Sequence, residues 1–328
     1  MTAAPPPSRI AVWLIFACAT VVFGGCAWVV DDDAHNGPRR PPPAPPDSAP
    51  SRQTPPCGET SSRRLARSRL PRPGHMPAGT FMRAIQHRGH LEVGLDTNFH
   101  GLGFVDSDAA QHMGLDIDVA REIARAIFGT LRIHYTPITT QQLRSAIVNK
   151  EVDIVASAFS MMCAPPRRVL FSSVYYRAQQ KLLVRKDSNV RGLSDLRGEH
   201  VCATRDSTWL ARLGQQRGVK PYPVEERTGC VVALEQGEVA AITSDDAILL
   251  SLMRESPTMI VGPCIGVDRY AMAIDKAHRT FLRFVDAVLR RLRRDGTVAR
   301  LRRRWLTGLP PTTAAEIAGC DRHAPRVP

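Results

Sequence analysis

The chain has 328 residues, enough for one large or two medium domains with a substantial core. Its formal net charge of +13 comes mostly from arginine, and much of that arginine lies in segments 63–72 and 290–304. No nucleic-acid recognition motif accompanies the charge, so we interpret it as solvated helix faces and a basic linker, not as a nucleic-acid-binding surface.

The N-terminus has the pattern of an export signal. Arg9 precedes an apolar run from Ile10 to Val30, and three aspartates follow it. The run is just long enough to span a bilayer of roughly 30 Å as an uncleaved anchor. Alternatively, "FGGC" resembles a lipobox, with residues 1–25 as the signal peptide and Cys26 as the lipid-modified residue. We favour the lipoprotein, and both alternatives place the body of the protein outside the cytoplasm, at the outer face of the cell membrane.

Residues 26–76 are rich in Pro, Arg and Ser with few large apolar side chains, which predicts a disordered linker. The segment 310–328 reads similarly and is expected to be a disordered tail. The folded part is therefore about 230 residues long.

Strand-like and helical patterns alternate within the folded part. Leu91 to Asp96 alternates as a strand, and Leu115 to Phe128 repeats apolar residues at helical spacing. "DIVAS" and "KLLVRK" are typical of further strands, and Thr280 to Arg294 is typical of a long helix, followed by a second helix that runs to Trp305. The alternation predicts an α/β fold.

Two segments in the folded part resemble each other. "AIVNKEVDIVAS" (Ala146 to Ser157) and "ALEQGEVAAITS" (Ala233 to Ser244) both read as a helix end, a tight turn, Glu-Val, a buried strand and a serine. This pattern predicts two similar α/β lobes. Ligands bind beyond the carboxyl ends of strands in open α/β sheets, so we expect Ser157 and Ser244 to face a shared ligand cleft.

The cysteines suggest disulfides more than metal binding. Apart from Cys18 and Cys26, the chain carries an even number of cysteines with no Cys-x-x-Cys spacing and no histidine cluster. Zinc is therefore not expected. The spacing leaves the pairing open among Cys57, Cys163, Cys202, Cys230, Cys264 and Cys320.

"GLDIDVAREIARAI" (Gly114 to Ile127) resembles the signature of the family 3 extracellular solute-binding proteins, the polar amino-acid receptors of ABC importers. We interpret Asp116 and Asp118 in it as helix-start carboxylates that accept backbone N–H groups. The similarity runs from about Phe81 to Leu309. "HVCATRDSTWL" and "GCVVALEQGEVAAITSDDAIL" are most similar to glutamate- and glutamine-binding lipoproteins of actinobacteria.

The resemblance implies a two-lobed fold of the periplasmic-binding-protein type, with two hinge strands and a ligand cleft between the lobes. Lobe 1 would contain residues 77–178 and 270–309, and lobe 2 residues 179–269. The hinges would lie near Tyr175–Gln179 and Gly266–Tyr270. Cys202 and Cys230 both fall in lobe 2, and we expect them to form a disulfide.

The resemblance also assigns ligand contacts. Asp245 matches the carboxylate that receives the ligand ammonium, and Phe99 the aromatic ring that packs over the ligand. Ser207 and Thr208 match a helix N-terminus that donates to the ligand carboxylate, although Asp206 replaces the glycine usual in that loop. The candidate ligand-binding residues are Asp96, Phe99, Ser157, Ser160, Arg167, Arg168, Arg205, Ser207, Thr208, Ser244 and Asp245.

One anchor of the family pattern is missing. Family members carry a threonine and, three residues later, an arginine that clamps the ligand carboxylate, and these positions are Met162 and Pro165 here. We expect Arg167 or Arg168 to replace the missing arginine. Arg205 could instead hold a side-chain carboxylate, which would favour aspartate or glutamate.

The function implied is a monomeric, lipid-anchored receptor that delivers a polar amino acid of the glutamate, glutamine or aspartate type to an ABC permease, with no cofactor, metal or nucleic acid. Two alternatives remain: a sensory or degenerate amino-acid-binding protein that reports to a membrane sensor protein, and a dehydratase on the same fold. No Ser/His/Asp group or GxSxG turn appears, and Asp245 alone is a poor general acid or base. The chain is therefore not expected to be an enzyme.

Overall fold

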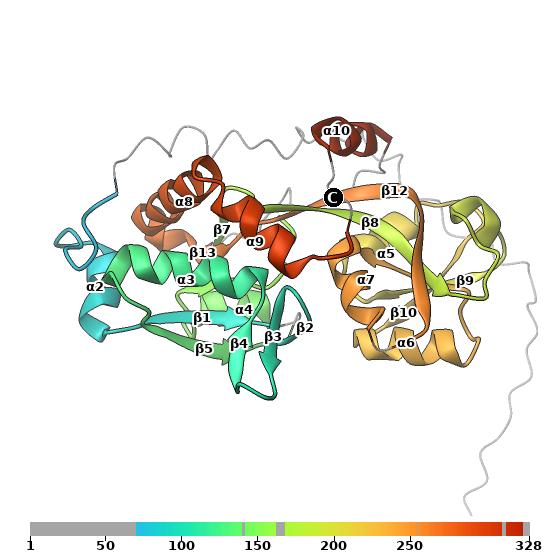
Figure 1. The fold of residues 1–328 in the computed structure, drawn as a ribbon, viewed down its shortest axis with the longest axis horizontal. Helices are drawn as coiled ribbons and strands as arrows, with labels where there is room; N and C mark the ends of the chain where they lie inside the picture. Colours follow the sequence, from blue (N-terminus) through green and yellow to red (C-terminus); the bar gives the residue numbers. More distant parts are fainter. Residues whose placement is uncertain (1–69, 140–141, 162–167, 255, 310–312, 324–328) are drawn as a thin grey trace, which may run out of the picture. The chain divides into compact units, whose positions relative to one another are not determined.

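The computed structural model describes residues 70–139, 142–161, 168–254, 256–309 and 313–323, which belong to one compact unit (Figure 1). The signal peptide, Cys26 and the linker up to residue 69 lie outside the described residues. None of the helices within these ranges is both long enough and apolar enough to cross a bilayer.

Lobe 1 is built on a five-stranded sheet in the order β5-β1-β6-β13-β7. β1 is parallel to β5 and β6, whereas β13 is antiparallel to β6 and β7. Its strands are β1 (Leu91–Leu95), β5 (Ile133–Pro137), β6 (Ile154–Val155), β7 (Val169–Phe171) and β13 (Ala273–Asp275), and a small separate sheet contains β2 (Asn98–Phe99), β3 (Gly103–Asp106) and β4 (Gln111–Met113). The helices of lobe 1 are α2 (Phe81–Arg88), α3 (Leu115–Phe128), α4 (Leu143–Val148), η2 (Lys276–His278), α8 (Arg279–Arg294) and α9 (Thr297–Trp305).

α3 confirms the helix predicted over residues 115–128. Its apolar side chains recur every three or four residues and are fully buried at Val119, Ala120, Ile123 and Ile127. Gly129 ends the helix in the left-handed conformation at φ 82°, and its N–H donates to the Arg125 carbonyl.

Asp116 and Asp118 lie in the first turn of α3, as expected, but neither carboxylate caps the helix, so that part of the helix-start interpretation is wrong. Asp116 is buried; its carboxylate accepts the Tyr175 hydroxyl at 2.7 Å and the Ala158 N–H at 2.6 Å. Burial raises the pKa of Asp116 to about 7 in spite of these donors. Asp118 accepts the indole N–H of Trp305 at 2.7 Å. The signature therefore fastens α3 to the loop after β6 and to the end of α9.

Lobe 2 is built on a second five-stranded sheet, in the order β10-β9-β11-β8-β12. β9 is parallel to β10 and β11, and β8 is antiparallel to β11 and β12. Its elements are β8 (Tyr176–Arg185), η1 (Leu193–Leu196), β9 (His200–Thr204), α5 (Thr208–Leu213), β10 (Lys220–Val224), α6 (Arg227–Glu235), β11 (Ala241–Asp245), α7 (Asp246–Leu252) and β12 (Thr258–Tyr270).

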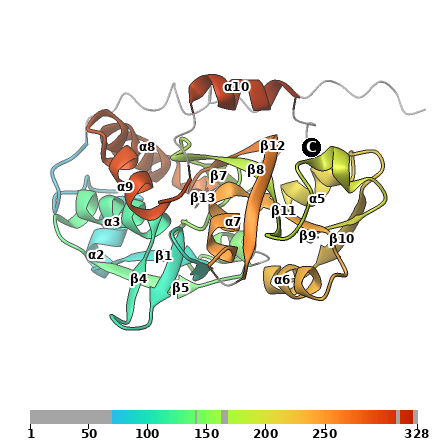
Figure 2. The same cartoon turned by 45° about the vertical axis from the view of Figure 1, so that its right-hand side comes forward.

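Two long strands connect the lobes. β8 and β12 pair from Tyr176–Tyr270 to Arg185–Thr258, with an irregularity between Val261 and Gly266. Figures 1 and 2 both show them side by side, running from lobe 1 into the sheet of lobe 2. The segments expected to act as hinges lie in or next to this pair, at its lobe 1 end.

The internal repeat is also present in the structure. α4 with β6 and α6 with β11 are both a helix, a tight turn and a strand that has one parallel and one antiparallel neighbour. In each unit the glutamate N–H donates at 2.9 Å to the carbonyl of an alanine in the preceding helix, from Glu151 to Ala146 and from Glu238 to Ala233. The residue before that glutamate is left-handed in both units, with φ 63° and 74°. The similar sequences therefore build the same local structure in each lobe.

Both ends of the folded part extend further than expected. At the N-terminal end, Met76 is buried, and the Gly74 N–H donates to the Ile127 carbonyl at 2.8 Å, so this part of the predicted linker is packed on lobe 1. At the C-terminal end, the prediction of a disordered tail is wrong for residues 314–323. They form the helix α10 (Ala314–His323), which lies against β12 and β8 (Figures 1 and 2). α10 is held by a disulfide from Cys320 and an ion pair from Asp321, neither of which composition reveals.

Two disulfides lie within the described residues. Cys202 in β9 is joined to Cys230 in α6, the pair expected from the sequence, with 5.5 Å between their Cα atoms. Cys264 in β12 is joined to Cys320 in α10, with 5.7 Å between their Cα atoms. Cys18, Cys26, Cys57 and Cys163 lie outside the described residues.

The two disulfides should differ in their effect on stability. Replacing Cys202 and Cys230 with serine should lower the free energy of unfolding by about 2–5 kcal/mol, because both side chains are fully buried in the core of lobe 2. Replacing Cys264 and Cys320 should release α10 with little effect on the main unfolding transition, because Cys320 is the one buried side chain of α10 among those described. Urea unfolding combined with limited proteolysis near residue 313 measures both effects. Equal losses of unfolding free energy in the two double variants would contradict this assignment.

Candidate functional site

The carboxyl ends of the central strands bring several expected residues together. Asp96 directly follows β1, Ser157 follows β6, and Asp245 is the last residue of β11. The Asp96 N–H donates to Ser157 Oγ at 3.0 Å, which ties the two strand ends of lobe 1 to each other. Asp96 Oδ1 accepts the N–H of Asn98 at 3.0 Å, so the turn into β2 is fixed as well.

An arginine that the sequence analysis did not select lies between the lobes at this point. Arg227 is the first residue of α6, and its guanidinium carbon lies 3.7 Å from the centre of the Phe99 ring. Its Nη2 is 3.3 Å from Asp96 Oδ2, and both side chains are largely buried. Burial lowers the pKa of Arg227 to about 10, while the nearby Asp96 carboxylate acts in the opposite direction. The guanidinium therefore stays charged at neutral pH, between an aromatic face and a carboxylate.

Asp245 is fully buried and hydrogen-bonded to two neutral donors. One oxygen accepts the indole N–H of Trp209 at 2.9 Å, and the other accepts the Tyr270 hydroxyl at 2.7 Å. Burial, and then the negative charge of Asp268, raise the pKa of Asp245 well above its usual range, although both hydrogen bonds act to lower it. A positive charge placed beside this carboxylate would stabilise its ionised form.

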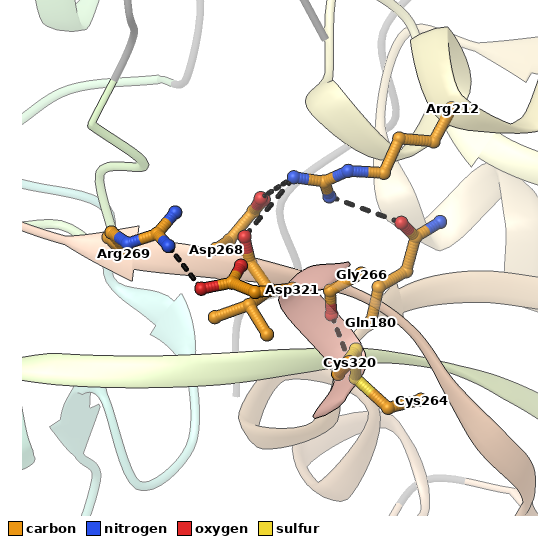
Figure 3. Close-up of a disulfide and its surroundings, with 9 residues drawn as sticks. Gln180, Arg212, Cys264, Gly266, Asp268, Arg269, Cys320 and Asp321 are labelled. Atoms are coloured by element: carbon orange, nitrogen blue, oxygen red, sulfur yellow. Dashed lines mark hydrogen bonds and ion pairs between the residues drawn. A yellow bond between two sulfur atoms is a disulfide. The ribbon is translucent and has the colours of Figure 1, made fainter. Parts of the chain in front are cut away.

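Asp268 accepts hydrogen bonds from two of the residues that were expected to contact the ligand. This residue of β12 accepts the Ser160 hydroxyl at 3.0 Å and the Thr208 hydroxyl on the same oxygen, Oδ2. Its other oxygen accepts from Arg212, whose guanidinium also donates to Gln180 Oε1 at 3.1 Å (Figure 3). Ser160 comes from lobe 1 and Thr208 from lobe 2, so one internal carboxylate joins hydroxyl groups of both lobes.

Ser207 does not hydrogen-bond to Asp268, because its side chain is used within the loop before α5. The Ser207 hydroxyl caps α5 by accepting the Leu210 N–H at 3.1 Å, and it donates to the Thr204 carbonyl at 2.6 Å. Asp206 adopts φ 58°, the left-handed conformation that glycine favours and that aspartate tolerates better than most residues. The replacement of glycine at this position is therefore accommodated by the loop.

The arginines expected to serve the ligand lie elsewhere or outside the described residues. Arg205 is about half exposed and pairs with Glu225. Arg168 is also exposed, and its guanidinium lies 3.8 Å from Asp275, so it does not turn back toward Ser160. Arg167 lies outside the described residues. In this structure the side chains of Arg205 and Arg168 are each directed at an acidic residue, Glu225 and Asp275, so a ligand role for either arginine stays a prediction.

Ser244 lies directly before Asp245 and is buried. Its Oγ has no hydrogen-bond partner within the described part of the chain. Ser244 and Asp245 are consecutive residues of β11, so their side chains point to opposite faces of the sheet.

Three charged residues of the site were missed. Arg212, Arg227 and Asp268 give no motif, since each is recognisable only by the partner that the fold brings to it. A weak signal existed in the helices. Arg212 lies three residues after Trp209, and Arg227 three before Cys230, so each arginine shares a helix face with a buried side chain. A charged residue on a buried face needs a partner.

A metal centre is not apparent in the residues that the structure describes, because no group of three or more His, Cys, Asp or Glu side chains could hold an ion. The carboxylates of the site are instead bonded to arginine, tyrosine, tryptophan, serine and threonine side chains.

Known proteins are similar to this chain in sequence and in fold. The glutamate-binding protein GluB of Corynebacterium glutamicum is 30% identical over 236 residues, which cover 67% of this chain and 79% of the relative. The ABC transporter glutamine-binding protein GlnH of Bacillus subtilis is 24% identical over 227 residues, covering 68% of this chain and 83% of the relative. Among solved structures, a mutant of ArgBP from T. maritima matches with a TM-score of 0.62 at 27% identity, over 69% of this chain and 99% of that chain.

The family described as bacterial extracellular solute-binding proteins, family 3, matches residues 91–308. This range contains both five-stranded sheets, the connecting strands β8 and β12, and helices α8 and α9. It also contains every described residue of the site. The chain belongs to the bacterial extracellular solute-binding proteins, family 3.

Proposed function

We propose that this protein is an extracytoplasmic receptor that binds a polar amino acid for an ABC importer and is anchored to the membrane by a lipid on Cys26. The names of the relatives support the transport role, and the "FGGC" segment supports the anchor. The same names support a binding protein over an enzyme. The observation that carries the proposal is the environment of Asp245.

Asp245 is suited to receive a ligand ammonium group. The donors on its carboxylate, Trp209 and Tyr270, are neutral, and the carboxylates of Asp268 and Asp246 lie close enough to raise its pKa. An ammonium in contact with Asp245 would favour the ionised carboxylate. The aromatic surroundings would keep that ion pair away from water, which strengthens it.

A second candidate function is supported by Asp268. The hydroxyl of Ser160, an expected ligand contact, and the hydroxyl of Thr208, whose helix N-terminus the family resemblance assigns to the ligand, donate to this internal carboxylate. A cleft whose donors are already engaged would suit a sensory or degenerate protein that reports to a membrane partner. Such a protein would bind common amino acids weakly or not at all.

Proton release tests the role of Asp245. Because burial raises the pKa of Asp245, an ammonium ligand that pairs with the carboxylate should lower this pKa on binding. Binding of L-glutamate or L-glutamine should therefore release protons and strengthen as the pH rises. Calorimetry in buffers with different ionisation enthalpies measures the release directly. Asp245→Asn should abolish the release and weaken binding by at least about 100-fold.

The matched control is Asp187→Asn, which removes an exposed carboxylate paired with Arg185 and should leave binding unchanged. Amino-acid binding that releases no proton and tolerates Asp245→Asn would overturn the role of Asp245. If no amino acid binds the wild type, the sensory or degenerate function replaces the receptor.

A further inference from the structure

The guanidinium of Arg227 lies between an aromatic ring and a carboxylate, two groups that favour a cation. Its central carbon lies 3.7 Å from the centre of the Phe99 ring, and Nη2 is 3.3 Å from Asp96 Oδ2. An aromatic face and an adjacent carboxylate are the two groups that recognise a guanidinium or an ammonium in a partly dry site. Phe99 and Asp96 come from lobe 1, whereas Arg227 comes from lobe 2.

The fold holds Arg227 firmly in this position. Arg227 begins α6, and Cys230, one helical turn later, is bonded to Cys202 in β9. The start of α6 is therefore anchored to the sheet of lobe 2 by a covalent bond.

The other arginines considered for the site are paired elsewhere, away from Phe99 and Asp96. Arg205 and Arg168 are exposed and paired with Glu225 and Asp275. Arg212 is buried in its pair with Asp268. Arg227 is thus the guanidinium that contacts Phe99, the residue expected to pack over the ligand.

We propose that Arg227 determines the charge selectivity of the ligand site by occupying the cation position on Phe99 and Asp96, so that acidic amino acids are preferred and cationic ones are excluded. This inference rests on the proposed amino-acid receptor function. The relatives leave the question open, because their names include glutamate-binding, glutamine-binding and arginine-binding proteins.

The selectivity follows from what each ligand would meet. A ligand carboxylate would meet a fixed positive charge. A ligand guanidinium would meet a like charge and an aromatic face already covered. Removing the Arg227 side chain uncovers the Phe99 ring and leaves Asp96 without this cation, which converts the same place into a site for a positive group.

The experiment measures L-glutamate and L-arginine binding by calorimetry for the wild type, Arg227→Ala and Arg227→Gln. Methylguanidinium is added as a small probe in thermal unfolding of the same three proteins. Arg227→Gln retains most of the side-chain length and guards against a folding defect in Arg227→Ala. Arg217→Ala is the matched control, since it removes an exposed arginine from the same lobe that is not among the candidate ligand contacts.

The wild type should prefer glutamate, and both Arg227 variants should shift the glutamate-to-arginine affinity ratio toward arginine by at least about tenfold. Methylguanidinium should raise the melting temperature of Arg227→Ala more than that of the wild type, and adding Phe99→Leu to the variant should remove this gain. Arg217→Ala should behave as the wild type.

An affinity ratio that is the same in the wild type and in the folded Arg227 variants would overturn the proposal. If the wild type binds no amino acid, the receptor function fails separately. In that case stabilisation of Arg227→Ala by methylguanidinium supports a cation site formed by Phe99 and Asp96. If methylguanidinium does not stabilise this variant, the cation site is refuted as well.

Discussion

The carboxylate of Asp268 is almost completely buried. It accepts hydrogen bonds from the side chains of Ser160, Thr208 and Arg212. Its strand, β12, also pairs with β8 along the connection between the lobes and carries Cys264, the attachment point of α10. Breaking a buried ion pair by removing one partner typically costs about 3–5 kcal/mol, so the Arg212–Asp268 pair fixes the arrangement around it. Lobe 1, lobe 2 and the connecting strands all meet at this one carboxylate.

The charges around Asp268 explain the rest of the site. Three buried carboxylates, of Asp96, Asp245 and Asp268, lie among the candidate ligand contacts. Arg227 pairs with Asp96 and Arg212 with Asp268, whereas the hydrogen bonds to Asp245 come from neutral groups. The raised pKa of Asp245 expresses this imbalance, and a ligand ammonium would correct it. The site therefore combines one carboxylate that favours an incoming cation with two that are neutralised by the protein itself.

Local sequence patterns were sufficient for part of this structure. The period of α3 and the repeated helix–turn–strand units specify elements through side chains a few residues apart. They also placed Asp96, Ser157 and Ser244 at or near strand ends. The polar partners were not predictable in this way, because Arg227 and Asp96 are 131 residues apart and Ser160 and Asp268 are 108 apart. Such pairs depend on how the lobes come together. Likewise, α10 has little apolar surface, and its position follows from the bond between Cys264 and Cys320.

The central claim is that the carboxylate of Asp268 links the two lobes by accepting a hydroxyl group from each of them. Small-angle X-ray scattering of the ligand-free wild type and of Asp268→Asn, with circular dichroism to confirm that the variant is folded, tests it most directly. We predict a larger radius of gyration for Asp268→Asn, because the hydroxyls of Ser160 and Thr208 lose their shared anion. We also predict a wild-type radius that barely changes on addition of glutamate. An identical radius for the two ligand-free proteins, or a wild type that contracts only when an amino acid is added, would contradict the account.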